Sequence, residues 1–280
     1  LVYMVGTPEA EPYLLTLFEK NLNTGEEQRI YEFFEYLGDG IRPGLPKSFS
    51  FCNNLIMYSV RSHGVEDPEC RCLLELFDLD VGQRETLICY SDWSVVEEAD
   101  MCNNIYFWSG YEADSPYRVI RDLFLFNLNT REKVQLTDGA RAYAPKLWGR
   151  QFVFEMGDRE ETLSWDVFLW DLDTMSYRNL TLHPSDQWSP DIWENRVVWV
   201  DHRNDPSGNY IAPHNSDIYW CELPDCEPVP ATTNWASQEH PTVGGDWIAW
   251  IDYRNDVNPL NPASSYHENL EIWGYNISTG

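Results

Sequence analysis

The clearest pattern in the chain is a short apolar run followed, after a polar connection, by a segment in which apolar and polar residues alternate. The best copy lies at residues 190–223, where PDIWENRVVWVDHRND precedes a long polar loop and SDIYWCEL. Residues 241–275 repeat this order as PTVGGDWIAWIDYRND, a polar loop and ENLEIWGYN. Continuous apolar runs indicate strands that are buried on both faces, and alternation indicates strands with one exposed face. The pattern therefore predicts repeated β-strands.

Weaker copies of the pattern precede these two, in PKLWGRQFVFEMGDR, MCNNIYFWSG, FCNNLIMYSV and LVYMVG. About six copies follow one another roughly 45 to 55 residues apart, which is the range of propeller blades. We therefore expect an all-β fold, a single β-propeller domain over residues 1–280 with six four-stranded blades, of which the first and last are incomplete. The expected blades are residues 1–47, 48–97, 98–143, 144–187, 188–237 and 238–280.

Turn residues agree with this assignment. The segments NLNTGEE, DLDVGQR, NLNTREK and DLDTMSY place Asp or Asn, with Thr, Gly or both, where a tight hairpin should join the third strand of a blade to the fourth. These residues supply side-chain hydrogen bonds and positive φ angles. Pro145, Pro190 and Pro241 fall in the expected first strands, where one edge faces the axis and needs no ladder bond.

The combined motif resembles a known repeat. D-[IL]-[YF]-x-[WF]-x-L, a Thr-Gly turn, and [IV]-[VA]-W-x-D-x-R-N are similar to the TolB-type (WD40-like) β-propeller repeat of bacterial and archaeal periplasmic and surface proteins. The D-x-R-N turn is present at Asp201–Asn204 and Asp252–Asn255 and absent from the first three repeats. The resemblance implies a propeller fold. It implies no single activity, because such propellers include binding modules, peptidase-associated domains and polysaccharide-degrading enzymes.

Charge narrows the range of partners. The formal net charge is −27, and a nucleic-acid partner would need a basic surface. We therefore expect no nucleic acid and no docking on anionic lipid. No run of 18 apolar residues is present, so we expect no membrane insertion. The charge suits a cationic partner or divalent cations, although a solvated acidic surface is its main explanation.

Seven cysteines indicate an oxidising compartment, and we expect an extracellular, cell-surface or periplasmic location. Three disulfides can be proposed from strand positions, which leaves Cys70 unpaired. The candidate pairs are Cys72 with Cys89, Cys221 with Cys226, and Cys52 with Cys102.

The long connections indicate where a ligand would bind. Loops between second and third strands and crossovers between blades emerge on one face of a propeller, and here they are long and carry all six histidines. His, Trp and Arg around a propeller mouth suit a polar ligand with flat apolar faces, such as a glycan or a peptide. The candidate ligand-binding residues are His202, His214, His240, Trp188, Trp235, Arg203 and Arg254.

Two further interpretations of these residues stay open. Asp201 with Arg203, and Asp252 with Arg254, can simply brace their own turns by charge-assisted hydrogen bonds. The oxygen-rich spacing of the same turns also suits calcium, although neither turn matches an EF-hand loop, and no other cofactor is indicated. The candidate metal ligands are Asp201, Asn204, Asp205, Asp252, Asn255 and Asp256.

No common catalytic signature is present: the chain has no G-x-S-x-G, H-E-x-x-H, P-loop or dinucleotide motif. We therefore favour a secreted or cell-surface binding propeller that recognises a glycan, a peptide or a partner protein. One alternative is a polysaccharide lyase or hydrolase that uses the same face, with His202, Arg203, His240 and Arg254 as catalytic candidates. A second alternative is a structural module of a larger surface assembly.

Overall fold

The structure is a computed structural model and describes residues 2–7, 13–20, 24, 26–35, 49–61, 72–90, 95–111, 120–157, 164–205, 215–260 and 268–280. In these ranges every regular element is a β-strand. None of the described residues form a helix long and apolar enough to cross a membrane.

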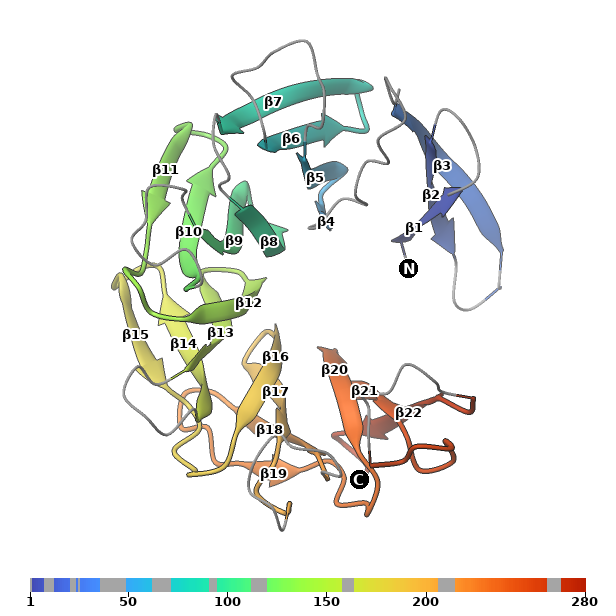
Figure 1. Cartoon of the computed structure of the whole chain (residues 1–280), viewed down its shortest axis with the longest axis vertical. Helices are drawn as coiled ribbons and strands as arrows, with labels where there is room; N and C mark the ends of the chain where they lie inside the picture. The colour runs from blue at the N-terminus through green and yellow to red at the C-terminus, as the bar shows by residue number, and fades with distance from the viewer. Residues whose placement is uncertain are drawn as a thin grey trace. The chain divides into compact units, whose positions relative to one another are not determined.

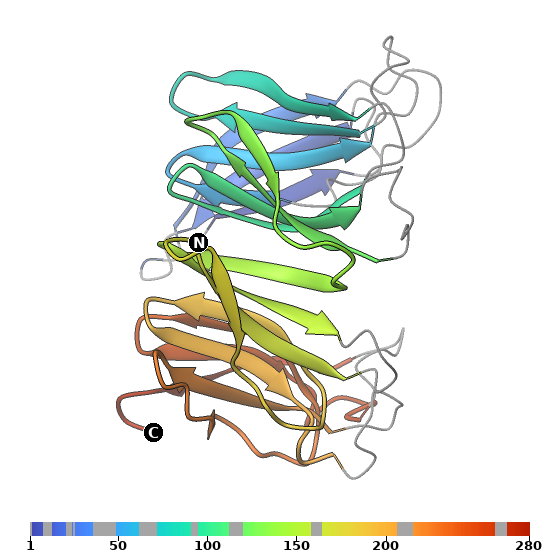
Figure 2. The same cartoon turned by 90° about the vertical axis from the view of Figure 1, so that its left-hand side faces the viewer.

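The described strands form six antiparallel sheets, and the chain divides into two compact units (Figures 1 and 2). Unit 1 comprises Leu1–Phe49 and Asn54–Ser94, and unit 2 comprises Ser50–Asn53 and Val95–Gly280. The strand β4 (Phe49–Cys52) is divided between the two units: Phe49 belongs to unit 1, and its last three residues belong to unit 2.

The sheets β1–β2–β3 and β4–β5–β6–β7 contain the strands of unit 1. In each sheet the strands pair in chain order, as expected when short turns join antiparallel neighbours. The bounds are β1 (Val2–Thr7), β2 (Tyr13–Lys20), β3 (Glu27–Glu35), β5 (Leu55–Arg61), β6 (Cys72–Asp78) and β7 (Gln83–Tyr90).

Unit 2 contains three four-stranded sheets and a last, three-stranded sheet, β20–β21–β22. The innermost strands β8, β12, β16 and β20 are neighbours in this order. The bounds are β8 (Val95–Cys102), β9 (Ile105–Tyr111), β10 (Asp122–Asn127), β11 (Glu132–Gln135), β12 (Ala142–Trp148), β13 (Gln151–Gly157), β14 (Trp165–Asp171), β15 (Ser176–Asn179), β16 (Gln187–Trp193), β17 (Arg196–Asp201), β18 (Asp217–Glu222), β19 (Val229–Pro230), β20 (Gln238–Gly244), β21 (Trp247–Asp252) and β22 (Glu271–Asn276).

This strand order confirms the predicted all-β blades with an incomplete first and last blade, and the predicted blade bounds remain a prediction. Within the described residues four sheets have four strands, and the first and last sheets have three. In the part of the chain that the structure describes, the first sheet has no strand inside β1 and the last has none outside β22, as the repeat indicates. The extent of a single domain over residues 1–280 remains a prediction.

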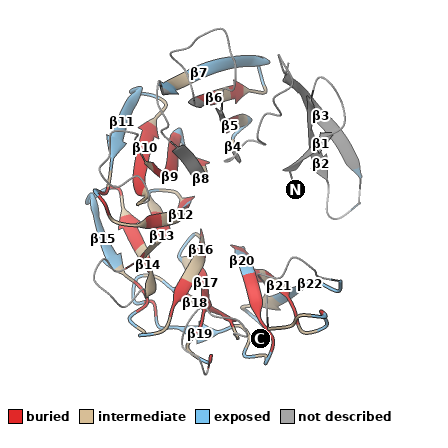
Figure 3. Cartoon of the chain, viewed as in Figure 1, coloured by how far each residue is buried: buried red, intermediate tan, exposed pale blue. Residues whose placement is uncertain are grey.

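Apolar faces of consecutive sheets form the core of unit 2. In the four-stranded sheets of this unit, most residues of the second and third strands are buried, whereas the outermost strands β11, β15 and β19 are exposed (Figure 3). Phe107 packs on Phe152 across two blades, with ring centroids 4.4 Å apart. Trp199 is fully buried between the fourth and fifth sheets. Each such side chain stabilises the fold by about 1.5 to 3 kcal/mol through burial, so packing between blades supports each sheet.

The outer hairpins form as their sequences predict. Asn127 Oδ1 accepts the backbone N–H groups of Asn129 and Thr130 at 2.9 and 3.2 Å. Asp78, Asp171 and Asn276 make the same pair of bonds at the equivalent turns. The positive φ that such turns require falls on Gly82 in one hairpin and on Arg131 in another. The Asx side chain therefore selects the turn even without glycine.

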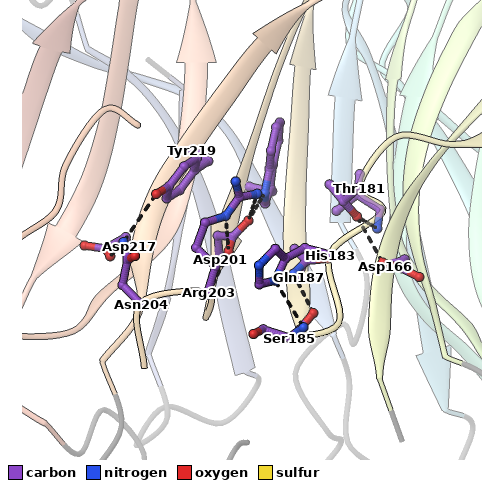
Figure 4. A network of polar contacts seen from close by, with 12 residues as sticks. Asp166, Thr181, His183, Ser185, Gln187, Asp201, Arg203, Asn204, Asp217 and Tyr219 are labelled. Atoms are coloured by element: carbon purple, nitrogen blue, oxygen red, sulfur yellow. Dashed lines mark hydrogen bonds and ion pairs between the residues drawn. The ribbon is translucent and has the colours of Figure 1, made fainter. Parts of the chain in front are cut away.

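Residues of the D-x-R-N turn in the fifth blade form hydrogen bonds with one another and with the neighbouring strands (Figure 4). Arg203 holds Asp201 in a bidentate pair, with Nε–Oδ1 and Nη2–Oδ2 distances of 2.9 and 2.7 Å. Trp199 Nε1 donates to the same carboxylate at 2.9 Å. The guanidinium also lies over the Tyr219 ring, 4.2 Å from its centroid. Charge-assisted bonds and ring stacking thus lock the end of β17 against β18.

The sixth blade repeats this network residue by residue. Arg254 pairs with Asp252, which also accepts a hydrogen bond from Trp250 Nε1 at 3.0 Å. The guanidinium lies 3.8 Å from the centroid of the Trp273 ring. Burial alone would raise the pKa of Asp252, but the hydrogen bonds from Arg254 and Trp250 lower it. The bracing interpretation of these turns therefore accounts for their contacts.

The cysteines differ from the prediction in part. The disulfide between Cys221 and Cys226 is formed, with a Cα–Cα distance of 4.7 Å. Cys89 is disulfide-bonded, but the side chain of its predicted partner Cys72 lies outside the described residues. Cys52 and Cys102 are free thiols, so the predicted bridge between them is absent. Their equivalent positions bring the two thiols into hydrogen-bonding contact, and burial raises the pKa of Cys102 to about 11.

This difference predicts a pattern of thiol reactivity. Without reductant, an alkylating reagent should modify Cys52 and Cys102. Cys102 should react slowly at neutral pH, because its raised pKa keeps the thiol protonated. Cys221 and Cys226 should react only after reduction, which makes them the internal control. Peptide mapping by mass spectrometry checks this, and a peptide that links Cys52 to Cys102 would contradict it.

Candidate functional site

The long connections of unit 2 leave their sheets at one end of the strands. Gln187 pairs with Asp201, and Asp201 pairs with Asp217, so these residues share one end of the fifth sheet. The rings of Trp148 and Trp193 lie 4.0 Å apart, centroid to centroid, at the opposite ends of β12 and β16, which indicates that neighbouring inner strands keep the same register. We call the end that leads to residues 112–119, 158–163, 206–214 and 261–267 the long-connection end. These four segments lie outside the described residues.

Near this end, each inner strand of unit 2 contains a bulge. The register with the second strand shifts in β8, β12, β16 and β20. In three of these bulges a non-glycine residue adopts positive φ: Ala144 at 48°, Ser189 at 51° and His240 at 54°. Such conformations cost about 1 to 3 kcal/mol each and concentrate at sites where the backbone must point in a particular direction.

The bulges direct backbone N–H groups toward carboxylates of the preceding blade. Ala144 N–H donates to Glu98 Oε2 at 2.9 Å, and Ser189 N–H donates to Glu155 Oε2 at 2.7 Å. An inner strand has no neighbour on its axial edge, so its N–H groups need side-chain acceptors. The bulge therefore couples the backbone of one blade to an ionisable group of the previous blade.

Two aspartates make equivalent bonds toward the other end. Asp100 Oδ2 accepts the Leu147 N–H at 2.8 Å, and Asp191 Oδ2 accepts the Val243 N–H at 3.0 Å. Burial raises the pKa of Asp191, against hydrogen bonds from Thr242 and Val243 and the charge of Lys146. Together with the bulge bonds, these contacts tie the inner strands β12, β16 and β20 each to the preceding blade.

Glu98, Arg121, Tyr143 and Glu155 form the first cluster at the long-connection end. Arg121 Nη1 lies 3.8 Å from Glu98 Oε2, and its guanidinium lies 4.7 Å from the centroid of the Tyr143 ring. The Glu98 side chain is 49% exposed and that of Arg121 27% exposed. Ser109 Oγ also donates to Glu98, at 3.4 Å. The cluster therefore presents a carboxylate and a guanidinium to solvent beside a second, partly buried acid.

That second acid, Glu155, has an unusual affinity for protons. Burial raises the pKa of Glu155 to about 7, and the nearby Glu98 charge adds to the effect. The Ser189 N–H and the Arg121 charge oppose it. A carboxyl group that titrates near neutral pH can accept or donate a proton under physiological conditions. Glu155 is thus chemically suited to act as a general acid or base.

A second cluster surrounds Glu239 at the same end of the fifth and sixth blades. Ser216 Oγ donates to Glu239 Oε1 at 2.7 Å, and Trp188 Nε1 lies 3.4 Å from Oε2. Burial raises the pKa of Glu239 to about 7. The Trp188 ring also meets the His202 ring edge-on, with centroids 4.4 Å apart.

The predicted ligand-binding residues occupy very different environments. His240 is exposed at its bulge, next to the buried Glu239, and Trp235 is 60% exposed on the crossover before it. Trp188 is half-buried, and His202 is fully buried. His214 lies outside the described residues. The structure thus brings Trp188, His202 and the Glu239–His240 pair together, and leaves His240 as the exposed histidine of this group.

The arginines and the candidate calcium ligands already have protein partners. Arg203 and Arg254 are bound to Asp201 and Asp252, as described above. Asp205 accepts the Asn215 N–H at 3.2 Å, and Asp256 accepts N–H groups of Glu268 and Asn269. Asn204 and Asn255 donate to Asp217 and Glu271. Among the described residues no group of three or more His, Cys, Asp or Glu side chains is placed to hold a metal ion. The calcium hypothesis therefore gains no support from this part of the chain.

The sequence analysis missed the acids of both clusters. In the second strand of the fourth blade, Glu155 interrupts the apolar run FVFEM, and one charged residue in such a run is a detectable signal. Glu239 lies in the sequence QEHP, where nothing distinguishes it from the other acids of a chain with 46 Asp and Glu residues. Their raised pKa values follow from burial that only the folded structure reveals.

No known family profile and no curated protein sequence matches this chain. Solved structures do match it. Putative TolB from Agrobacterium tumefaciens aligns with a TM-score of 0.62 and 12% identity over 95% of this chain and 86% of its own. TolB from Acinetobacter baumannii aligns with a TM-score of 0.55 and 15% identity over 100% of this chain and 67% of its own.

An enzyme is among the similar structures. Oligogalacturonate lyase from Vibrio parahaemolyticus aligns with a TM-score of 0.59 and 12% identity over 94% of this chain and 74% of its own. At such identities the likeness concerns the fold alone. With the blade order described above, it shows that this chain adopts the TolB-type β-propeller fold.

Proposed function

We propose that this chain is a ligand-binding β-propeller of a secreted, cell-surface or periplasmic protein. It binds a polar ligand, a glycan, a peptide or a partner protein, at the long-connection end of unit 2. One observation carries the proposal: three consecutive inner strands place a strained bulge at this end, and the bulges at Ala144 and Ser189 each donate a backbone N–H to a carboxylate. Strained backbone conformations of this kind concentrate at functional sites.

The exposed groups at this end define the chemistry of binding. Glu98 accepts hydrogen bonds, Arg121 donates them, and His240 can do either. Trp188 and Tyr143 add partly buried aromatic surface beside these groups. Mixed donors and acceptors over aromatic rings suit a polar ligand with apolar faces. The Cys221–Cys226 disulfide supports an oxidising location.

A second candidate is a polysaccharide lyase or hydrolase. The observation that favours it is that Glu155 has a pKa of about 7 and lies near the positive charge of Arg121. In a lyase the carboxylate would remove the proton next to a uronate carboxyl group, and Arg121 would hold that group. The similarity to an oligogalacturonate lyase fold is compatible with this chemistry. Arg203 and Arg254 are held in bidentate pairs with fully buried aspartates, whereas Arg121 makes one longer contact, 3.8 Å, with a half-exposed glutamate. Glu155 and Arg121 therefore replace them as the leading catalytic candidates, with His240 beside them.

The functional test compares binding with turnover. The purified chain is titrated with oligogalacturonate, neutral oligosaccharides and a peptide library, and the release of an ultraviolet-absorbing unsaturated uronate is followed. A binding module gives saturable binding without product, and Glu98→Gln or His240→Ala should weaken binding about tenfold or more. Glu132→Gln, on the exposed strand β11, is the matched control and should have no effect.

Each outcome decides between the candidates. Product formation that is lost in Glu155→Gln establishes the enzyme and overturns the binding module. Binding that is unchanged in both Glu98→Gln and His240→Ala removes this end of the propeller as the site. A chain that binds none of the probes, but melts at a higher temperature with calcium, supports the structural module.

Burial of Glu239 also predicts a pH dependence of stability. The folded-state pKa of Glu239 lies above its ordinary value, so its favourable contribution is complete at low pH and is lost as pH rises from about 4.5 to 7. Glu239→Gln should therefore match the parent near pH 4 and exceed its unfolding free energy at pH 8 by on the order of 2 to 3 kcal/mol. Urea unfolding at both pH values measures this difference. An equal difference at both pH values would contradict the assignment.

A further inference from the structure

Two free thiols meet at the end of unit 2 opposite to the long connections. Cys52 is the last residue of β4 and Cys102 is the last residue of β8, and both are partly buried. Cys102 pairs with Ile105 across the β8–β9 hairpin, whereas the long connection of the same sheet follows Tyr111, at the other end of β9. The thiols are therefore separate from the two acid clusters.

A hydrogen bond holds the strand ends that carry these thiols side by side. Ser50 Oγ donates to Asp100 Oδ1 at 3.1 Å, and each of these residues lies two positions before its cysteine. Side chains alternate between the faces of a strand, so residues two positions apart lie on the same face. The Ser50–Asp100 contact therefore directs the two thiols toward each other, and Cys52 and Cys102 are in hydrogen-bonding contact.

Two turns of the same kind fix the backbone beside each sulfur. The turn Asn53–Asn54 follows Cys52, and the turn Asn103–Asn104 follows Cys102. All four asparagines have positive φ, between 49° and 61°. Two consecutive residues with positive φ form the tight type I′ turn of a two-residue hairpin. Each thiol is thus held by its own hairpin, so little entropy remains to be lost when a ligand joins the pair.

The surroundings of the thiol pair suit a soft metal ion. Cys102 packs against the apolar cluster that includes Ile105 and Phe152, and its sulfur accepts a hydrogen bond from the Gly149 backbone N–H. Such a donor stabilises the negative charge of a thiolate, which is the form that binds metal. Burial and the neighbouring Cys52 raise the pKa of Cys102, so a bound cation has to displace a proton.

The number of ligands selects the metal. Both oxygens of the neighbouring Asp100 carboxylate already accept hydrogen bonds, from the Ser50 hydroxyl and from the N–H groups of Met101 and Leu147. Among the described residues no third His, Cys, Asp or Glu side chain completes a metal site with the two thiols. Structural zinc takes four ligands. Soft thiolates also select Cu(I), and two sulfurs in a linear arrangement satisfy that ion.

We propose that Cys52 and Cys102 bind one Cu(I) ion between the ends of β4 and β8. Each thiol releases its proton and forms one sulfur–copper bond, and the oxidation state of copper does not change. With metal–sulfur bonds of about 2.3 Å, the length for zinc, a linear arrangement places the sulfurs about 4.6 Å apart. Two thiols in hydrogen-bonding contact are already close to this separation. The site does not depend on the function proposed for the long-connection end.

The test titrates the purified chain with Cu(I) against bicinchoninate, a coloured Cu(I) chelator, without oxygen and with ascorbate. Ascorbate keeps the copper reduced and leaves the Cys221–Cys226 disulfide closed. The chain should withdraw one Cu(I) ion from the chelator. Cys52→Ser and Cys102→Ser should each weaken binding at least about a hundredfold, because a hydroxyl is a poor ligand for a soft ion. Asn103→Gly keeps both thiols and suits the positive φ of the turn, so this matched control should bind like the parent.

Alkylation of the parent chain is a second measurement that does not require the variants to fold. One equivalent of Cu(I) should protect Cys52 and Cys102 together in peptide maps, whereas one equivalent of Zn²⁺ should protect neither. The proposal is overturned if the chain withdraws no Cu(I), or if either serine variant binds Cu(I) like the parent. It is also overturned if Cu(I) protects only one of the two thiols, or if Zn²⁺ protects them equally.

Discussion

The structure of unit 2 depends on how the inner strand of each blade satisfies its axial edge. That edge has no further strand, and its N–H groups would lose hydrogen bonds if nothing replaced the ladder. Carboxylates of the preceding blade provide the acceptors: Asp100 for Leu147 and Asp191 for Val243. Glu98 and Glu155 do the same for the bulged residues Ala144 and Ser189. One type of bond therefore fixes the blade register and positions the ionisable groups.

This requirement links the fold to the candidate site. The carboxylates that accept these bonds must lie beside the inner strands, where burial raises the pKa of some of them. Glu155 reaches a pKa of about 7 through burial and the nearby Glu98 charge, whereas the Glu98 side chain is half exposed. The acids at the long-connection end thus arise from the same geometry that closes the blade edges. A binding or catalytic role would make use of groups that the fold already requires.

Much of the fold could be predicted from the sequence. The apolar and alternating segments and the inner-strand prolines predict β-strands with their two-residue periodicity, and the Asx residues predict the tight hairpins. These signals are local in the sequence. The incomplete first and last blades also follow from the repeat. The thiols of Cys52 and Cys102 were correctly placed in equivalent positions but wrongly joined, because residue order indicates strand position and not the geometry that a disulfide needs.

The site was less predictable because it depends on burial and on backbone direction. His202 and His240 look alike in sequence, yet one is fully buried against Trp188 and the other is exposed at a bulge. Positive φ at Ala144 and Ser189 has no sequence signal, since neither is a residue type that favours it. The D-x-R-N turns are easily recognised in the sequence, but their contacts stabilise the blade in which each turn lies. Long-range contacts, and not residue type, decide which polar groups reach solvent.

The most direct test of this account is amide hydrogen exchange at Val243 in the parent chain and in Asp191→Ala. If the Asp191 carboxylate closes the axial edge, its removal should speed exchange at Val243 at least about tenfold. The Leu172 amide, which donates to the Arg150 carbonyl at 3.0 Å, should exchange as before. A Val243 amide that stays equally protected in Asp191→Ala would contradict the account.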